Sequence, residues 1–556
     1  MIRNPVDTGA SDRHRRLNFG ERAEMRLCVT GASGNVGTAL LGALASDPKV
    51  EEVVGIARRR PDTTAAPYNT ARWQVVDLAM PVPSAEDETK VVEKLAAVFQ
   101  GMDAVVHLAW MIQPNRNRRL LQRANVVGTR RVVDACLRAG VRHLVCASSV
   151  GAYSGVHDDD PRDETWSTRG VPSAHYSADK AAQERVLDDA ESQGLAIARV
   201  RPALVFDASA GAEVTRLFLG PMVPARLLRT GALPVVPLPA GLRFQVVHAD
   251  DLADAYRRIL GSVATGPFNV ATDGVLRGGD LVEVLGARRR MALPARALRP
   301  AMELAWRAHA VAADPGWMDM AMSAPIMDTE RIRAELDWRP RRDARSTLLE
   351  MIAAIADGDG AASAPMRPRL RWPRDQQAPG EIPPIAVTGE GHRLPASIER
   401  DIFALYLSDH LTGATGGADR ASRMAHGYAD TPIGEELARF AAEARRERTF
   451  LKELVSSLEL PRRRHRQAVA WIGEKIGRLK SNGRSTDSPM TPVLEIELMR
   501  GAVASKLGCW ETLADLSPEL GFPSAVFTDL AARARAQLTT LQGLHERVAA
   551  GAFRVG

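Results

Sequence analysis

Cysteine is scarce in this chain. Only four cysteines occur in 556 residues, and no two of them stand in a Cys-x-x-Cys spacing. Cys28, Cys136, Cys146 and Cys509 lie far apart in apolar or helical contexts, which favours neither a disulfide framework nor a zinc site. The pattern is typical of a cytoplasmic protein, and we expect no metal site to be built from these cysteines.

Long apolar runs and blocks of one charge are also missing. No stretch of about 18 apolar residues is present to span a bilayer, and residues 1–24 lack the apolar core of a signal peptide. We therefore predict a disordered leader over residues 1–24 and no membrane span. The net charge of +6 is small against 73 basic and 67 acidic residues and lies in no single block, which argues against a nucleic-acid partner.

The first part of the chain shows an alternation of strand and helix patterns. From Met25 to about Val200, short apolar runs such as RLCVTG and DAVVHLA alternate with helical stretches such as TALLGALA. This alternation indicates βαβ units, hence an α/β fold with a parallel sheet covered by helices. Right-handed crossovers then predict a doubly wound sheet of the Rossmann type.

The second half of the chain has a different character. Seven prolines lie between Pro365 and Pro395 without sustained periodicity, so we predict a proline-rich linker over residues 361–395, or an extended strap on the surface. Beyond it, apolar residues at 3.6-residue spacing predict an all-α bundle of four or five helices over residues 396–556. Two stripes carry this expectation: Leu437, Phe440, Ala444, Leu451, Leu454 and Leu458, then Leu530, Ala534, Leu538, Leu541 and Val548.

The stretch TGASGNVG follows an apolar strand and precedes a helix. In that context, spaced glycines let the backbone approach a pyrophosphate that faces the positive end of the helix. The turn predicts a dinucleotide site with contacts from Gly31, Ser33, Gly34, Asn35, Val36 and Gly37.

The residues after the second strand bear on the choice of dinucleotide. Arg58 and Arg59 stand where an NAD-selective site usually has an acidic residue for the ribose, and a guanidinium can hold a 2′-phosphate. We therefore expect NADP in preference to NAD, against the alternative that both arginines are simply exposed on a loop. Asp77 and Leu78 follow the strand WQVV, where Asp77 is placed to accept from the adenine amino group or is an ordinary loop residue.

A further strand end reads HLA. Leu108 and Ala109 would bring their backbone close to the dinucleotide at this edge of the sheet. His107, taken singly, is more typical of a structural histidine at the end of a strand.

The most specific signal is HYSADKAAQE. Tyr176 and Lys180 are four residues apart on a predicted helix and therefore share one face. A free tyrosine has a pKa of about 10, so acid/base work near neutral pH needs a fixed cation beside the phenol, and Lys180 can supply it. Lys180 is the only lysine between Lys94 and Lys452, which makes a chance pairing an unattractive explanation.

Upstream of this helix, Ser148 and Ser149 end the apolar strand in HLVCASSVGAY. Open parallel sheets bind their ligands at this edge, so a serine hydroxyl here can polarise a carbonyl or orient an alcohol. A plain turn at the end of the strand is the alternative.

Together these motifs resemble the extended short-chain dehydrogenase/reductase family, the group of NAD(P)-dependent epimerases, dehydratases and reductases. The resemblance rests on TGASGNVG, VVDL, HLAW, Asn125, ASSVGAY, YSADK, Arg201 with Pro202, and FQVVHADDLADA, which follow one another in family order. It covers residues 25–360 and implies a Rossmann domain with a small substrate-binding lobe.

The resemblance also implies roles. Tyr176 would be the acid/base, Lys180 its partner and a ribose ligand, and Ser149 the hydroxyl that faces the substrate, with Ser148 as the fallback. Asn125 would support the active-site helix. The implied cofactor is NADP or NAD, and the implied partner is a small-molecule substrate.

Two departures from the family concern the substrate. Members that act on nucleotide sugars usually have an asparagine-bearing segment where this chain reads RPALVFDASAG, and an arginine where it has Phe244. We therefore do not expect a nucleotide sugar. The segments LFLGPMVPARLL and ALPVVPLPAGL favour a small or partly apolar carbonyl or alcohol, or serve as packing of a lid.

The helical region looks like a ferritin-like bundle by the number and length of its helices. Asp409 falls on the stripe of Ile402 and Leu405, and Glu447 and His545 fall on apolar stripes of their own helices. The Glu-x-x-His pairs of di-iron carboxylate bundles are absent from it, so we assign no metal ligands. The bundle is then a structural or interaction domain, which covers the cofactor domain or joins copies of the chain in a homo-oligomer.

Three functions follow from these observations. The first is an oxidoreductase or epimerase that acts by hydride transfer on an unknown carbonyl or alcohol, fused to an accessory bundle. The second is a non-catalytic NADP(H) sensor coupled to an interaction or metal-binding bundle. The third, a metal oxidase with its own reductase, needs ligands that the sequence does not supply. We favour the first because a sensor has no need of Tyr176, Lys180 and Ser149.

Overall fold

A computed structural model describes residues 24–113, 116–219, 228, 231, 234–307, 311–368, 394–428, 433–460 and 490–552. The chain divides into two compact units, Met1–Leu370 and Arg371–Gly556. The division falls within the predicted linker. The predicted leader, except Glu24, and positions 369–393 of the linker lie outside the described residues.

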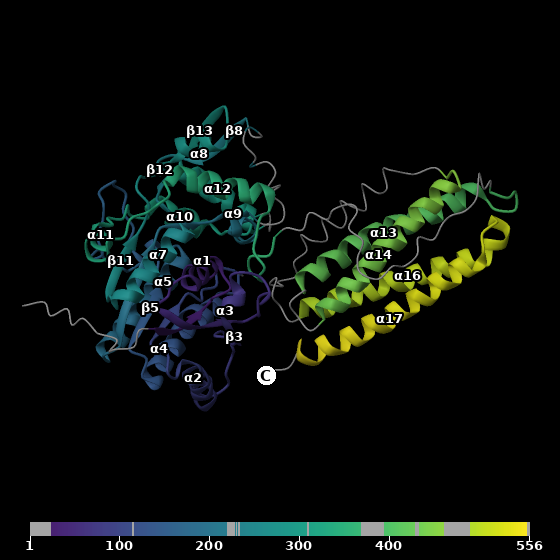
Figure 1. Cartoon of the computed structure of the whole chain (residues 1–556). Coiled ribbons are helices and arrows are strands. Elements are labelled where there is room, and N and C mark those ends of the chain that lie inside the picture. The colour runs from purple at the N-terminus through teal and green to yellow at the C-terminus, as the bar shows by residue number, and fades with distance from the viewer. Residues whose placement is uncertain are drawn as a thin grey trace, which may run out of the picture. The chain divides into compact units, whose positions relative to one another are not determined.

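A parallel sheet of seven strands forms the centre of the first unit (Figure 1). The strand order is β3-β2-β1-β4-β5-β6-β11, so the chain leaves β1 in one direction and returns past it in the other, as the predicted doubly wound fold requires. The fold class is thereby confirmed. The strands are β1 (Met25–Thr30), β2 (Val50–Ala57), β3 (Arg72–Val75), β4 (Ala104–His107), β5 (His143–Ala147), β6 (Ala196–Pro202) and β11 (Gly266–Val270).

Helices cover both faces of this sheet and bury it. Every residue of β4 is buried, which is why the strands read as continuous apolar runs rather than as alternating ones. Two helices pack on one face, α1 (Asn35–Ala45) and α7 (Ala249–Ser262). Three pack on the other, α2 (Ala85–Phe99), α4 (Gly128–Ala139) and α5 (His175–Ser192). The carboxyl ends of the strands remain accessible to a ligand.

A smaller lobe is built from segments that leave the sheet after β6. Its strands form three pairs: β7 (Leu204–Phe206) with β10 (Val246–His248), β9 (Arg243–Phe244) with β12 (Leu276–Arg277), and β8 (Val235–Pro239) with β13 (Arg289–Leu293). The other helices of the unit are α3 (Arg118–Gln122), α6 (Gly211–Val214), α8 (Gly278–Val284), α9 (Ala295–Arg307), α10 (Pro315–Ser323), α11 (Glu330–Leu336) and α12 (Ala344–Asp357). Most of LFLGPMVPARLL lies outside the described residues.

The first residues of the predicted linker are packed against the sheet domain. Ser363 and Met366 are fully buried, and the Ser363 hydroxyl donates to the carbonyl oxygen of Ser33 at 2.7 Å. We call residues 361–368 the strap. Buried side chains and a specific hydrogen bond therefore fix these eight residues on the sheet domain.

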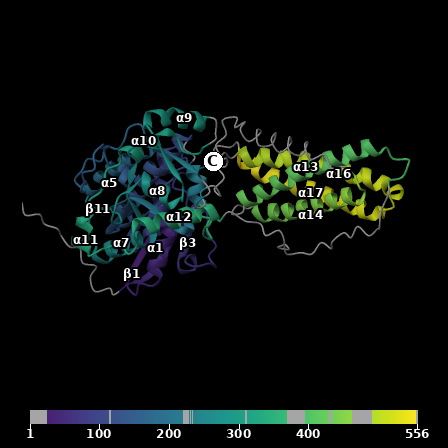
Figure 2. The same cartoon turned by 90° about the horizontal axis from the view of Figure 1, so that it is seen from above.

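The second unit contains four described helices that run side by side (Figures 1 and 2). They are α13 (Arg400–Gly427), α14 (Gly434–Ser457), α16 (Met490–Leu520) and α17 (Ser524–Ala552). Both predicted stripes contribute to one apolar core, in which Leu437, Leu454 and Leu541 are fully buried. The all-α character is confirmed, whereas the ferritin-like assignment stays a prediction.

One stripe of the bundle was placed wrongly. On α13 the buried face carries Phe403, Leu407 and Leu411, while Ile402 is 69% exposed and Asp409 also faces solvent. The predicted stripe began at Ile402, which is apolar but points outward, whereas the buried face begins one residue later, at Phe403.

Glu447 and His545 engage separate partners. The Glu447 carboxylate pairs with Lys506, and the His545 ring lies 3.0 Å from a Glu497 oxygen. Over the described ranges, no group of three or more His, Cys, Asp or Glu residues is placed to hold a metal ion. Within the same ranges, no helix combines the length and apolarity needed to cross a membrane.

Candidate active site

The glycine turn joins β1 to α1 at the carboxyl edge of the sheet. Gly31 has φ +71, and a Cβ at this position would lie 2.6 Å from the backbone nitrogen of Ala109. A Cβ at Gly37 would lie 2.5 Å from the carbonyl oxygen of Gly31. Both positions therefore require glycine, and the turn stays close against the end of β4. The helix α1 begins directly after Gly34, which lines the cleft.

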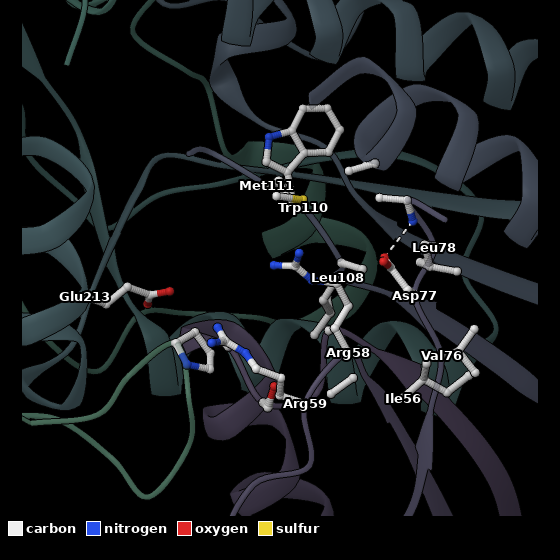
Figure 3. A pocket seen from close by; sticks show the side chains of 18 residues that line it. Ile56, Arg58, Arg59, Val76, Asp77, Leu78, Leu108, Trp110, Met111 and Glu213 are labelled. Carbon is white, nitrogen blue, oxygen red and sulfur yellow. Dashed lines mark hydrogen bonds between the residues drawn. The ribbon is translucent and has the colours of Figure 1, made fainter. Parts of the chain in front are cut away.

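A cleft extends from this turn along the edge of the sheet (Figure 3). Gly31, Ser33 and Gly34 form its floor, and the segments after β2, β3 and β4 form its walls. Asn35, Val36 and Gly37 belong to the first turn of α1 beside it. Twelve of the residues assigned to the cofactor from the sequence line or adjoin this cleft: Gly31, Ser33, Gly34, Asn35, Val36, Gly37, Arg58, Arg59, Asp77, Leu78, Leu108 and Ala109.

Charged side chains stand at the outer end of the cleft. Arg58 and Arg59 are exposed and line it directly after β2. Asp77 accepts a hydrogen bond from the backbone N–H of Ala79 at 2.9 Å, which fixes its carboxylate at the wall, and Leu78 is buried beside it. Figure 3 shows Glu213 pointing into the cleft from the side opposite Asp77.

His107 lies at the inner end and has a structural role. Its Nδ1 is 2.7 Å from the Thr30 hydroxyl and its Nε2 is 3.0 Å from the Thr129 hydroxyl. Burial lowers the pKa of His107 to about 3, so the ring is neutral. The reading of His107 as a strand-end structural histidine agrees with this geometry, while Leu108 and Ala109 present backbone to the cleft.

Tyr176 lies in the first turn of α5 and packs on backbone. A Cβ at Gly151 would come within 2.9 Å of Tyr176 Cε1, so the phenol ring lies directly against this glycine. Burial raises the pKa of Tyr176, and a side-chain hydrogen bond with Ser149 opposes the rise. The sequence pattern thus brings Tyr176 and Ser149 together.

Lys180 is buried one helical turn further along α5. Its ammonium donates to the Ala147 carbonyl oxygen at 2.7 Å and to the Gln183 side-chain oxygen at 3.0 Å. Burial lowers the pKa of Lys180 to about 7, and the nearby thiol of Cys146 and carboxylate of Glu184 oppose this change. The ammonium charge is therefore poorly solvated, and its electrostatic interactions with neighbouring groups are correspondingly strong.

An indole lies against both members of the pair. The Lys180 ammonium is 3.6 Å from the centroid of the Trp110 ring, and the Tyr176 ring meets the same indole edge-on at 5.8 Å between centroids. Within the described parts of the chain, no hydrogen bond joins Tyr176 to Lys180. Trp110 also lines the cleft, so the cofactor surface and the Tyr176 surface meet at this residue.

The two serines have different partners. Ser148 donates to the Glu184 carboxylate at 2.5 Å, and Glu184 also accepts from Arg199 and Arg201 in a buried network. Ser149 accepts from the Gly151 amide at 3.0 Å and reaches Tyr176. Ser148 is therefore occupied by a structural network, which leaves Ser149 as the hydroxyl beside Tyr176.

Asn125 fixes the chain that carries Trp110. Its side-chain oxygen accepts from the Met111 amide at 2.7 Å, and its side-chain nitrogen donates to the Met111 carbonyl oxygen at 2.9 Å. Asn125 thus orders the segment after β4 whose Trp110 contacts Tyr176 and Lys180, and its role as a support of the active-site helix stays a prediction.

Two residues outside the sequence motifs also line the cleft. Pro365 of the strap and Glu213 of α6 both line it. The strap is held on one side by Ser33 and on the other by Arg216, which donates to the carbonyl oxygens of Pro365 and Arg367. Burial raises the pKa of Glu213 to about 7. The only sequence signal for Glu213 as a cleft residue is that it is a single acidic residue in an apolar stretch. No sequence signal indicates that the strap lines the cleft.

The residues of the cleft fit a dinucleotide. A turn that tolerates no Cβ at Gly31 or Gly37, a helix that begins beside it and two arginines at its outer end match the shape and charge of an adenosine diphosphate moiety. The side-chain oxygen of Asn35 is buried and has no hydrogen-bond partner among the described residues, so it is available to a ligand at the start of α1.

Comparison with known proteins finds a family match for this part of the chain. Residues 27–271 match the model of the NAD dependent epimerase/dehydratase family. An uncharacterised protein of Mycobacterium tuberculosis is 29% identical over 334 residues, which cover 60% of this chain and 30% of that protein. The chain thus spans about 30% of the length of this relative.

Two further matches are shorter or more distant. Sterol-4-alpha-carboxylate 3-dehydrogenase, decarboxylating, of Saccharomyces cerevisiae is 37% identical over 107 residues, 19% of this chain and 30% of that protein. A UDP-glucose 4-epimerase of Thermus thermophilus solved in complex with NAD is 22% identical, covers 60% of this chain and 99% of its own, and superposes with a TM-score of 0.43. The expected nicotinamide dinucleotide agrees with the family description, whereas the preference for NADP stays a prediction.

Proposed function

We propose that this chain, whose residues 27–271 form a domain of the NAD dependent epimerase/dehydratase family, is an oxidoreductase or epimerase of the short-chain dehydrogenase/reductase type. It would transfer hydride between a nicotinamide dinucleotide and a carbonyl or alcohol. The observation that carries the proposal is the position of Tyr176, which neighbours Ser149 and whose ring packs against Trp110, a residue that lines the cofactor cleft.

In this proposal the nicotinamide ring, when bound, gives or accepts the hydride. Tyr176 moves the proton: as the substrate carbon gains hydride, the phenol donates its proton to the substrate oxygen, and the tyrosine is later reprotonated from solvent. Ser149 donates to the same substrate oxygen and orients it. Lys180 holds the ribose hydroxyls and favours the phenolate by its charge.

The structure offers this reaction a protected place. Lys180 and Ser149 are buried, and the Tyr176 ring is enclosed by Gly151 and two indoles, Trp110 and Trp317. Exclusion of water strengthens each of these interactions. The substrate would be an apolar carbonyl or alcohol, in line with the sterol-4-alpha-carboxylate 3-dehydrogenase among the relatives.

The test uses the full chain with NADPH or NADH and a panel of cyclic and linear ketones, followed by absorbance of the reduced nicotinamide. We expect dinucleotide binding and turnover of at least one ketone. Tight binding of the dinucleotide without turnover of any ketone or of the matching alcohols would instead favour the sensor.

A further inference from the structure

We infer that Trp317, on α10, is the substrate-contact residue that selects a flat, apolar ring ketone or alcohol carrying a second hydrogen-bond acceptor. This inference rests on the proposed function, because it names the class of substrate at the same site. Three independent observations support it: the stacking of Trp317 on Tyr176, the unpartnered indole N–H, and the fixed position of α10.

The first observation is an aromatic wall beside Tyr176. The Trp317 ring lies 4.8 Å from the Tyr176 ring between centroids, at 39° between planes. Phe218 meets Trp317 edge-on at 4.9 Å and 88°. A substrate oxygen that reaches the Tyr176 hydroxyl brings the attached carbon skeleton against the groups that border that ring. Aromatic faces favour flat apolar rings over flexible chains, since stacking orders fewer rotatable bonds.

The second observation is a donor without an acceptor. The Trp317 Nε1 atom is buried and has no hydrogen-bond partner within the described residues. In the same unit, Trp166 donates to the Ser154 carbonyl oxygen at 3.0 Å and Trp338 to that of Asp251 at 2.9 Å. Buried donors in native proteins are almost always paired, and an indole can only donate. The indole N–H of Trp110, which also contacts Tyr176, is likewise buried without a partner within the described residues, but Trp110 lines the cofactor cleft. The unmet donor of Trp317 therefore indicates an acceptor on the substrate.

The third observation is that α10 is clamped to the start of α5. Asp314 accepts from the Gly316 amide at 2.8 Å, and its other carboxylate oxygen lies 2.7 Å from His175 Nδ1. A Cβ at Gly316 would stand 2.6 Å from the Ser173 carbonyl oxygen, so the two helix starts are in direct backbone contact. Trp317 is thus held against Tyr176 by its helix and is not a side chain on a free loop, as a specificity residue requires.

The test measures binding rather than turnover alone. Dissociation constants of 2-tetralone, of its 5-, 6- and 7-methoxy derivatives and of linear 2-decanone are determined calorimetrically for the full chain saturated with dinucleotide. The methoxy oxygen supplies the second acceptor at three positions, and 2-decanone has the same number of carbons without the flat ring. Trp317→Phe keeps a ring face but removes the N–H, and Trp317→Leu removes both. Trp166→Phe is the matched control, because its indole N–H is already paired.

We expect the original chain to prefer 2-tetralone over 2-decanone, and one methoxy isomer to bind about five- to tenfold more tightly than 2-tetralone, as one added hydrogen bond allows. Trp317→Phe should abolish the methoxy preference alone, and Trp317→Leu should abolish both preferences. No preference in the original chain, or preferences unchanged in the Trp317 variants, would overturn the inference.

These results are separable from the proposed function. Intact binding preferences without turnover of any ketone contradict hydride transfer and leave the role of Trp317 standing. Turnover with preferences that ignore Trp317 contradicts only the present inference. Trp166→Phe should show the same binding preferences as the original chain for every ketone. Loss of these preferences in Trp166→Phe as well would indicate a general effect on folding and count against the role of Trp317.

Discussion

The Lys180 ammonium lies 3.6 Å from the centre of the Trp110 indole, which the ring of Tyr176 also contacts edge-on. An aromatic face stabilises a buried cation, so Trp110 offsets part of the cost of holding Lys180 away from water. The indole also lines the cofactor cleft. The position of Trp110 therefore connects cofactor binding to the acid/base group.

Replacing Lys180 should raise the stability of the folded chain and abolish its activity. Burial lowers the pKa of this ammonium from its ordinary value to about 7, so between that pH and about 10 the unfolded chain binds the extra proton. The buried charge thus destabilises the folded state most below pH 7, and its cost fades as the pH rises toward 10. Lys180→Met should raise the melting temperature by about 2 °C or more at pH 7 and progressively less at higher pH, while turnover is lost.

Lys94→Met, at an exposed site, is the control for the loss of a lysine charge. A lower melting temperature in Lys180→Met than in the original chain would contradict the prediction.

Gly151 should tolerate no side chain. An alanine Cβ would lie 2.9 Å from Tyr176 Cε1 and 3.0 Å from the Met320 sulfur, so the phenol must shift. A displaced acid/base group costs about 10²-fold in turnover, because reacting atoms need close alignment. We expect Gly151→Ala to lower kcat by this order with unchanged dinucleotide affinity. Gly42→Ala, where a Cβ meets nothing within 4 Å, should leave kcat unchanged; equal kcat in both variants would show that Tyr176 does not depend on this contact.

The parts of the fold that were predictable depend on local repetition. Strand and helix alternation before Val200 specifies a doubly wound sheet because each element is apolar on the faces it buries. The glycine turn was predictable because Gly31 and Gly37 sit where backbones approach to contact distance. The Tyr176 site followed from the helical spacing of one motif.

The remaining features arise from contacts distant in the chain. Trp317 reaches Tyr176 from 141 positions away in the sequence, and Ser363 reaches Ser33 over 330 positions. The proline-rich composition of the strap predicts a linker, because composition alone carries no information on which side chains become buried. On α13, alanine and glycine give little polarity contrast, so the register that buries Leu407 and exposes Ile402 could not be separated from its neighbour.

The arginines after β2 should determine the choice of dinucleotide. Arg58 and Arg59 are exposed at the outer end of the cleft, where a 2′-phosphate would lie if NADP is bound as predicted. A guanidinium–phosphate contact contributes strongly to affinity. Replacing both by alanine should weaken NADPH binding by about tenfold or more and change NADH binding by less than about threefold. Fluorescence titration measures both constants, and equal losses for the two dinucleotides would contradict the assignment.

The strap should control the exchange of the dinucleotide. Its Ser363 contact with Ser33 spans the floor of the cleft, and Arg216 holds the other side. We expect Ser363→Ala to accelerate dissociation of NADH by several-fold, because one buried hydrogen bond of about 1 kcal/mol is lost. Stopped-flow fluorescence measures the rate. Ser262→Ala, at an exposed helix end, should match the original chain, and a Ser363→Ala rate equal to it would exclude the strap as a barrier.

The central claim is that Tyr176 carries the proton during hydride transfer, and Tyr176→Phe tests it with a single oxygen atom removed. The measurement is turnover of the best ketone by the full chain, alongside calorimetric affinity for the dinucleotide in the same preparation. The account predicts a loss of turnover of about 10²- to 10⁴-fold, as expected for removal of a general acid, with dinucleotide affinity within about twofold. Turnover at the original rate, with the dinucleotide bound, would contradict it.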